Sequence, residues 1–225
     1  MKRLVIAIDG PAASGKSTTA KLLAQRLGLL PVDTGAMYRA VTLRVLELGL
    51  DPHDEARVTE VARRLNIRQE FRDGTVRTFV DGRDVSEEIR TPEVTRWVSL
   101  VSSYRGVREA MVAQQRAMAA RGGVVLEGRD IGTVVLPDAD LKVFMKASAD
   151  ERARRRLREL QEKGIPATFE EVLADIQRRD RLDSSRALSP LKKAEDAIEI
   201  DTTHLTIHEQ VERILEELRR RGLDP

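Results

Sequence analysis

A glycine-rich segment near the amino terminus has the residue types and the spacing of a phosphate-binding loop. Residues 10–17 read Gly-Pro-Ala-Ala-Ser-Gly-Lys-Ser and fit the pattern G-x-x-x-x-G-K-[ST] at every fixed position. In such a loop, successive backbone N–H groups that are unpaired at the start of a helix point inward at a phosphate. We expect Lys16 to reach the β- and γ-phosphates of ATP and the Ser17 hydroxyl to bind Mg²⁺. The predicted ATP-binding residues are Gly10, Pro11, Ala12, Ala13, Ser14, Gly15, Lys16, Ser17 and Thr18.

Three further segments, over residues 33–39, 128–133 and 178–186, combine arginine with carboxylate or hydroxyl side chains. Taken singly, each would also be explained by ordinary surface ion pairs. Arginine binds phosphate through two parallel hydrogen bonds and stays charged at any working pH. All three segments lie at predicted strand ends or helix starts, and ligands of open parallel sheets bind beyond the carboxyl ends of the strands. We therefore expect two of them to face the phosphate-binding loop across one crevice.

A phosphate-binding loop alone does not separate a kinase from a nucleotide switch or an ATPase motor. A guanine-nucleotide switch would need an Asn/Thr-Lys-x-Asp motif, but Asn66 is the only asparagine and no Lys-x-Asp sequence occurs. A motor would end an apolar strand in an acidic residue that serves Mg²⁺ and water. Here that strand ends in Glu127 and is followed by Arg129, which suits a second anion better than a hydrolytic water. A kinase is favoured, while a kinase for another small acceptor and an ATPase that binds nucleic acid remain alternatives.

The composition of the 225 residues limits the classes of function. Apolar residues make up 41% and charged residues 34%, which is typical of soluble globular proteins. With no cysteine, the chain has no disulfide, thiolate nucleophile or cysteine-bound metal. Aromatic residues make up only 3%, so few side chains are available to stack on the bases of a single-stranded nucleic acid. We expect small-molecule ligands and no nucleic-acid partner.

The apolar runs of the chain are short. None approaches the roughly 20 residues that a membrane span needs. The run at residues 4–8 is far too short for a secretory signal and has no cleavage site behind it. We therefore expect a cytoplasmic protein without a membrane partner, and we expect it to be a monomer.

Short apolar runs alternate with stretches of helical periodicity, which predicts a mainly parallel sheet built from β-α-β units. Strands are predicted over residues 4–8, 29–32, 124–126, 141–145 and 197–200. Helices are predicted over residues 18–27, 36–48, 91–121, 149–161, 169–183 and 207–221. Residues 67–71 and 76–80 alternate apolar with polar side chains and are followed by Asp-Gly pairs, which predicts a small antiparallel insert.

Taken together, these segments resemble those of the bacterial cytidylate kinases, a family of nucleoside monophosphate kinases with a phosphate-binding loop. The resemblance extends over essentially the whole chain. It rests on residues 8–17, 33–39, 84–91, 107–109, 128–135 and 160–164. The insert at about residues 64–85 also looks like the extra β-rich piece of that family, which short adenylate-kinase relatives lack.

The elements and the resemblance imply an α/β fold of three layers, the fold of P-loop kinases. A central parallel sheet is flanked by helices, a small antiparallel β insert lies in the monophosphate-binding region, and helices form a lid. We expect a single domain over residues 1–225, with the monophosphate-binding region at residues 36–103, its insert at about 64–85 and the lid at 152–186.

The resemblance implies transfer of the γ-phosphate of ATP to CMP or dCMP, with Mg²⁺ as the cofactor, in pyrimidine nucleotide metabolism. The exocyclic amino group of cytosine is a donor that a carboxylate accepts well, whereas uracil has a carbonyl there that Asp130 would repel. Thr34 stands where serine is common in the family, and either hydroxyl can donate. The implied CMP-binding residues are Thr34, then Arg39, Arg129 and Arg186 for the phosphate, Ser99, Arg108 and Asp130 for the base, and Arg179 and Asp183 for the sugar.

Phosphoryl transfer depends on positioning and charge neutralisation more than on covalent chemistry. The basic helices on either side of Gly164 resemble the lid of the family, and closure of such a lid excludes water and prevents wasteful hydrolysis of ATP. The choice among the lid arginines that reach the transferred phosphoryl group stays open. The predicted catalytic residues are Lys16, Arg152, Arg155, Arg156 and Arg186.

Overall fold

The computed structural model describes residues 3–223, so residues 1–2 and 224–225 of the predicted domain lie outside the described residues. Its five-stranded central sheet is parallel throughout and has the order β2-β6-β1-β7-β8. The register pairs Asp9 with Gly128 and Asp33 with Glu127. The carboxyl ends of these strands therefore share one edge of the sheet. The strands are β1 (Val5–Asp9), β2 (Leu30–Asp33), β6 (Val124–Gly128), β7 (Leu141–Lys146) and β8 (Ile198–Asp201).

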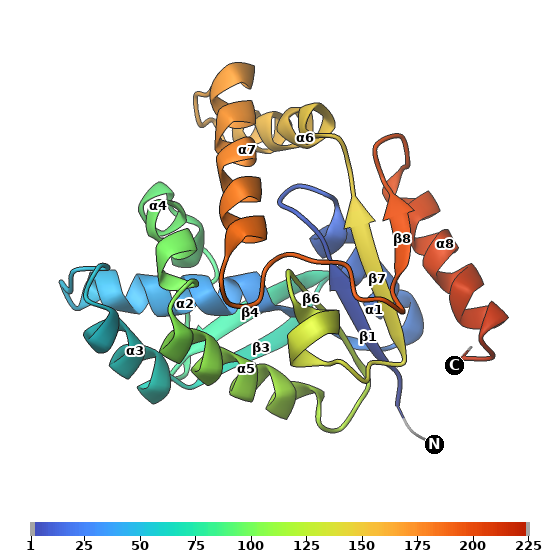
Figure 1. Cartoon of the computed structure of the whole chain (residues 1–225), viewed down its shortest axis with the longest axis horizontal. Coiled ribbons are helices and arrows are strands. Elements are labelled where there is room, and N and C mark those ends of the chain that lie inside the picture. The colour runs from blue at the N-terminus through green and yellow to red at the C-terminus, as the bar shows by residue number, and fades with distance from the viewer. Residues whose placement is uncertain (1–2, 224–225) are drawn as a thin grey trace.

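Helices cover both faces of this sheet because the strand side chains alternate between the two faces (Figure 1). α1 (Lys16–Leu27) and α8 (Ile207–Arg220) bury Ile6, Ile8 and Val125 on one face. α2 (Thr34–Glu47) and α5 (Arg105–Ala119) bury Ala7, Val124 and Leu126 on the other. These are the three layers of the predicted α/β fold. None of the helices within residues 3–223 is both long and apolar enough to cross a membrane.

A small antiparallel sheet forms the predicted insert. Asp73 and Gly74 join its first two strands with φ of 51° and 71°, the left-handed geometry of a two-residue type I′ hairpin. The Gln69 side chain fastens the insert to the main sheet, because it accepts from the Asp33 N–H at 2.9 Å and donates to the Asp33 carbonyl at 2.8 Å. The insert thus braces the end of β2, where α2 begins. Its strands are β3 (Ile67–Arg72), β4 (Thr75–Val80) and β5 (Arg83–Asp84).

One helical prediction is wrong, and one helix was not predicted. The single helix expected over residues 91–121 is two helices, α4 (Pro92–Val101) and α5. The Ser102 and Ser103 hydroxyls donate to carbonyls of the preceding turn, and such bonds compete with continuation of the helix. No element was predicted over α3 (Glu55–Arg64), although Val58 and Ala62 lie four residues apart on its buried face. A 3-10 helix, η1 (Glu88–Arg90), joins the insert to α4.

The predicted lid is helical and follows β7. α6 (Ala149–Glu162) and α7 (Phe169–Ser185) stand over the carboxyl ends of the strands, at the top of Figure 1. They share a small core of their own that includes Ala153, Val172 and Ile176. β6 leads into a π-helix, η2 (Ile131–Val135), a rare form that is frequent at functional sites. The lid, the loop after β1 and the turn after β6 therefore all lie at the carboxyl ends of the strands.

Candidate active site

The loop that follows β1 turns sharply into α1, as its glycines predict. Gly15 has a φ of 93°, a left-handed conformation that glycine adopts without strain. Gly10 packs so closely on β7 that a side-chain carbon there would lie 2.4 Å from the Met145 carbonyl oxygen. α1 begins at Lys16, and its N-cap residue, Gly15, has no side chain to pair with the first N–H groups. These backbone donors at the positive end of the helix dipole form an anion site.

The buried Lys16 and Glu127 form a polar cluster with the exposed Ser17 beside this loop. Ser17 donates to the Glu127 carboxylate at 2.6 Å, and Lys16 Nζ lies 3.7 Å from its other oxygen. Lys16 Nζ also donates to the Pro11 carbonyl at 3.3 Å. Burial and the nearby Arg129 lower the pKa of Lys16 to about 8, although Glu127 opposes this shift. Burial also raises the pKa of the Glu127 carboxyl. A phosphate in the loop would therefore stabilise the charged form of Lys16.

Glu127 is absent from the predicted site residues, although the sequence carries a signal for it: an acidic residue at the end of a buried strand. Mg²⁺ prefers oxygen ligands and is usually held by one or two carboxylates together with substrate phosphates. The Ser17 hydroxyl and the Glu127 carboxylate are two such oxygen groups in contact. Over residues 3–223, no three or more His, Asp or Glu side chains gather into a metal site. The donor set therefore fits a metal that comes with a nucleotide.

The end of β1 also holds the turn that carries Arg129 and Asp130. The Asp9 carboxylate accepts from the backbone N–H groups of Ile131 and Gly132, both at 2.8 Å. Burial raises the pKa of Asp9 to about 6, even though these two hydrogen bonds lower it. One residue at the start of the phosphate-binding loop thus fixes the turn that follows β6. Asp9 was not among the predicted site residues, because its partners are backbone groups more than a hundred residues away.

The predicted phosphate-binding arginines come from three elements. Arg129, after β6, and Arg186, after α7, meet at the Asp183 carboxylate at 2.8 and 2.7 Å. Burial alone would raise the pKa of Asp183, but the two arginines hold it below its ordinary value. Arg39, in α2, donates to the Thr95 hydroxyl at 2.8 Å. The fold thus brings Arg129 and Arg186 into direct contact with one carboxylate and anchors Arg39 to α4.

Several arginines lie close enough to one another around Arg39, Arg179 and Arg186 to affect one another's pKa values. Burial and the neighbouring Arg179 lower the pKa of Arg39 to about 10. Burial also lowers the pKa of Arg179 and of Arg186, and other arginines act on both in the same direction. A bound anion would stabilise the charged form of each side chain. This is the electrostatic character expected of a phosphate site.

Arg108 and Asp130, predicted to contact the base, form a buried ion pair. Arg108 also donates to the Ser102 carbonyl at 3.1 Å and lies over the Tyr38 ring, 5.4 Å from its centre. The buried charge of Asp130 is therefore compensated by a partner within the protein. Ser99 is half-buried on α4, and within residues 3–223 no hydrogen bond joins its hydroxyl to this pair. An ion pair thus joins two of the three predicted base-site residues, and within the described part of the chain no hydrogen bond joins Ser99 to them.

Thr34 and Arg179 complete the predicted CMP-binding residues. The Thr34 hydroxyl donates to the Glu127 carbonyl at 2.8 Å, and a side-chain carbon at Gly128 would lie 2.6 Å from that hydroxyl. Thr34 therefore sits where the strand of Glu127 passes into the turn of Arg129. Arg179, predicted for the sugar, lies on α7 with its Nε 3.0 Å from Asp175. Its ion-pair partner thus comes from its own helix, and Nε itself is buried without a hydrogen-bond acceptor in good geometry among the described residues.

Arg152, the first of the predicted lid arginines, contacts both the lid and the phosphate-binding loop. It donates to the two carboxylate oxygens of Asp180, on α7, at 2.9 and 2.6 Å. It also donates to the Ala12 carbonyl at 3.3 Å. The side chain is buried. Arg152 therefore ties the two lid helices to each other and to the loop.

Arg155 and Arg156 differ in their surroundings although they are adjacent. Arg155 donates to the Thr202 hydroxyl at 3.2 Å and to the Thr202 carbonyl at 2.5 Å, and its Nε lies 3.1 Å from Glu151. Arg156 pairs with Glu159, one turn further along α6, and its side chain is 35% exposed. Of the two, Arg156 is the more accessible.

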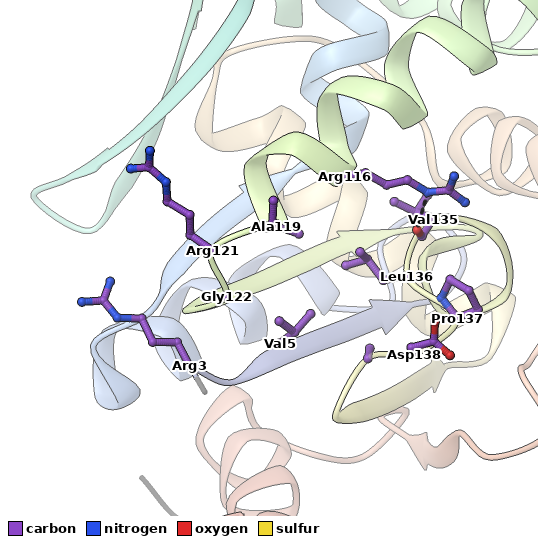
Figure 2. A pocket seen from close by; sticks show the side chains of 12 residues that line it. Arg3, Val5, Arg116, Ala119, Arg121, Gly122, Val135, Leu136, Pro137 and Asp138 are labelled. Carbon is purple, nitrogen blue, oxygen red and sulfur yellow. Dashed lines mark hydrogen bonds between the residues drawn. The ribbon is translucent and has the colours of Figure 1, made fainter. Parts of the chain in front are cut away.

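A cavity of about 620 Å³ lies at the opposite end of the sheet (Figure 2). It is lined by residues that precede β1, β6 and β7, among them Arg3, Gly122 and Leu136. Figure 2 shows Val5 and Leu136 along its apolar wall. The phosphate-binding loop follows the carboxyl end of β1, so this cavity is not part of the candidate site.

Comparisons with known proteins show the family to which the sequence is similar. The family model described as cytidylate kinase matches residues 6–220. Cytidylate kinases of Bacillus thuringiensis (strain Al Hakam) and Bacillus cereus (strain AH187) are each 53% identical to this chain over 216 residues, which is 95% of this chain and 95% of each relative.

Two solved structures share the fold. An uncharacterized protein from Eubacterium ventriosum has a TM-score of 0.52 at 14% identity, with 98% of this chain and 100% of that chain covered. A gluconokinase from Sinorhizobium meliloti 1021 has a TM-score of 0.50 at 15% identity, with 98% of this chain and 94% of that chain covered. The predicted α/β kinase fold is confirmed.

Proposed function

The chain belongs to the cytidylate kinase family, and we propose that its phosphate-binding loop and the arginines around Asp183 are the two substrate sites of this activity. The protein is an ATP-dependent kinase that phosphorylates CMP. The site proposal depends mainly on the end of β6 and the turn that follows it, because residues there contact both proposed sites. Glu127 contacts Lys16 and Ser17 of the loop, and two residues later Arg129 forms an ion pair with Asp183.

We propose that residues 10–18 bind the phosphates of ATP. The backbone donors at the start of α1 and the buried Lys16 amine both favour an anion there. Lys16 would hold the β- and γ-phosphates and neutralise charge as the γ-phosphoryl group leaves. Because burial lowers the pKa of Lys16 to about 8, nucleotide binding should increase its positive charge near neutral pH.

We further propose that Mg²⁺ enters with ATP and is held by the Ser17 hydroxyl, with the Glu127 carboxylate beside it. Both groups offer oxygen ligands, and they are 2.6 Å apart. When bound, the ion neutralises negative charge that develops on the phosphates. Glu127 has a second task in the protein itself, since it orients both Ser17 and Lys16.

For the acceptor, we propose that Arg39, Arg129 and Arg186, with Thr34, bind the phosphate of CMP or dCMP. Burial and neighbouring arginines lower the pKa of Arg39 and of Arg186, which supports this assignment. Their positions on different elements would let them surround a phosphate from several sides. Arg186 would also neutralise charge during transfer.

We propose that Asp130 reads the amino group of cytosine, with Arg108 and Ser99 as the other base contacts. The ion pair with Arg108 fixes the Asp130 carboxylate before the base arrives. A carboxylate accepts from cytosine and repels the carbonyl that uracil has at the same position. Arg179 and Asp183, on α7, are proposed for the sugar. This places residues 36–103 and the lid at 152–186 on two sides of the acceptor.

A panel of acceptors tests the proposed specificity. Purified protein with ATP and Mg²⁺ should release ADP rapidly with CMP and dCMP and slowly with UMP, AMP and GMP, in an assay coupled to ADP formation. A preference for another monophosphate would overturn the acceptor assignment. ATP hydrolysis that polynucleotide stimulates and CMP leaves unchanged would instead indicate an ATPase module. We also propose that the enzyme is a monomer, which light scattering of the purified protein would test.

A further inference from the structure

The Ser14 carbonyl of the phosphate-binding loop accepts a hydrogen bond from a residue outside the loop. Thr202, which directly follows β8, is completely buried. Its hydroxyl lies 2.8 Å from the Ser14 carbonyl oxygen and 3.1 Å from the Lys146 carbonyl oxygen. The Thr202 N–H donates to the same Lys146 carbonyl at 2.7 Å, so the residue is fixed to the end of β7. The hydroxyl is therefore presented to the loop from a rigid strand end.

Holding the Ser14 carbonyl fixes the direction of the next N–H group. In a planar trans peptide the C=O and the N–H point in opposite directions. The peptide that carries the Ser14 carbonyl also carries the Gly15 N–H, so that N–H must point away from Thr202. Gly15 has a φ of 93°, and glycine tolerates several backbone conformations at little cost. Without an anchor, this peptide is free to rotate and to turn its donor away from a phosphate.

Arg155 completes the arrangement from the lid. Its guanidinium donates to the Thr202 hydroxyl at 3.2 Å and to the Thr202 carbonyl at 2.5 Å. A hydroxyl that accepts from arginine has its single proton left to donate, and the Ser14 carbonyl is its nearer acceptor. With Nε beside Glu151, all three nitrogens of the Arg155 guanidinium face protein oxygens. The side chain is 18% exposed, about half the value for Arg156.

We propose that Thr202 and Arg155 are positioning residues for the phosphates of ATP, and that they connect the lid helix α6 to the phosphate-binding loop. Thr202 holds the Ser14 peptide so that the Gly15 N–H faces the nucleotide, and Arg155 orients the Thr202 hydroxyl. Arg155 then acts through Thr202 and does not touch the transferred phosphoryl group. This inference rests on the proposed function of the loop as the ATP site.

Thr202→Val removes the hydroxyl and keeps the shape of the side chain. Because one net hydrogen bond is lost, the KM for ATP and the Kd for ADP should rise about 3- to 10-fold. The KM for CMP should stay within about twofold of the wild-type value, because within residues 3–223 Thr202 makes no hydrogen bond to a residue proposed for CMP and distant sites act independently. Thr202→Ser, which keeps the hydroxyl, should restore ADP affinity. Thr203→Val is the matched control, since the Thr203 hydroxyl faces Asp201 and the Ser148 N–H and not the loop.

Arg155→Met tests whether Arg155 orients the Thr202 hydroxyl. ADP affinity should fall by a similar factor, and the double variant with Thr202→Val should be no weaker than Thr202→Val alone, because both changes break the same connection. Unchanged ADP affinity in either single variant would overturn the proposal, as would independent, additive losses in the double variant. A fall in kcat by orders of magnitude with normal ADP affinity in Arg155→Met would make Arg155 a catalytic residue instead.

Different measurements test the positioning role and the acceptor site. The Kd for ADP, measured by calorimetry without an acceptor, tests the positioning role even if the acceptor assignment is wrong. If Thr202→Val does not fold, the ADP affinities of Arg155→Met and Thr202→Ser still decide the outcome. A wild-type protein that binds ADP but does not phosphorylate CMP would overturn the proposed acceptor site and leave the positioning proposal standing.

Discussion

Replacing Asp9 with asparagine tests whether the carboxylate that fastens the turn after β6 to the end of β1 makes folding depend on pH. Asp9 is 4% exposed, and burial raises its pKa from the ordinary 3.8 to about 6. The folded protein therefore binds this proton more tightly than the unfolded chain does. The contribution of Asp9 is most favourable at low pH and is lost as the pH rises through the folded pKa. A shift of about two pKa units corresponds to about 3 kcal/mol.

Urea unfolding at a series of pH values measures this contribution. Asparagine does not titrate, and its carbonyl oxygen still accepts from one of the two N–H groups at Ile131 and Gly132. The free energy of unfolding of the wild type, minus that of Asp9→Asn, should fall by about 2 kcal/mol between about pH 4 and about pH 7. Other carboxylates titrate in both proteins and cancel in this difference.

Asp73→Asn is the matched control for Asp9→Asn. It removes one carboxylate from an exposed hairpin turn, where asparagine tolerates the positive φ of 51°. The free energy of unfolding of the wild type, minus that of Asp73→Asn, should vary much less with pH. A difference between wild type and Asp9→Asn that stays constant across the pH range would refute the reasoning, because it would mean that Asp9 binds its proton equally in the folded and unfolded chains.

Three further substitutions test the site. Lys16→Met should lower kcat by more than about 100-fold with little change in the thermal midpoint, and full activity in the coupled assay would remove Lys16 from the chemistry. Asp130→Asn, which leaves Arg108 a polar partner, should reduce the ratio of kcat/KM for CMP to that for UMP by about tenfold; an unchanged ratio would place the base reader elsewhere. Glu127→Gln should raise the Mg²⁺ concentration for half-maximal rate by about tenfold or more, and an unaltered Mg²⁺ titration would contradict its place beside the ion.

Local patterns were sufficient to predict the main elements. The apolar run before Gly10 and the glycine-lysine spacing after it predict strand, loop and helix because each depends on neighbouring residues only. The hairpin at Asp73 and Gly74 follows from the same kind of rule. The break between α4 and α5 was missed because helical periodicity continues through residues 102–104, while serine hydroxyl bonds end the first helix.

The sequence by itself determined the phosphate-binding loop, the order of the main strands and helices apart from α3 and the break between α4 and α5, and the supply of arginines for a second anion. Only the tertiary structure decided which groups meet. Asp9 reaches the turn after β6, Glu127 joins Ser17 across 110 residues, and Arg155 reaches Thr202 across 47. The physical reason is that hydrogen bonds form between groups brought close in space, and the pairing of parallel strands sets that closeness. Residue types and their spacing indicate which side chains are available for chemistry, whereas strand order and register determine which of them lie close together.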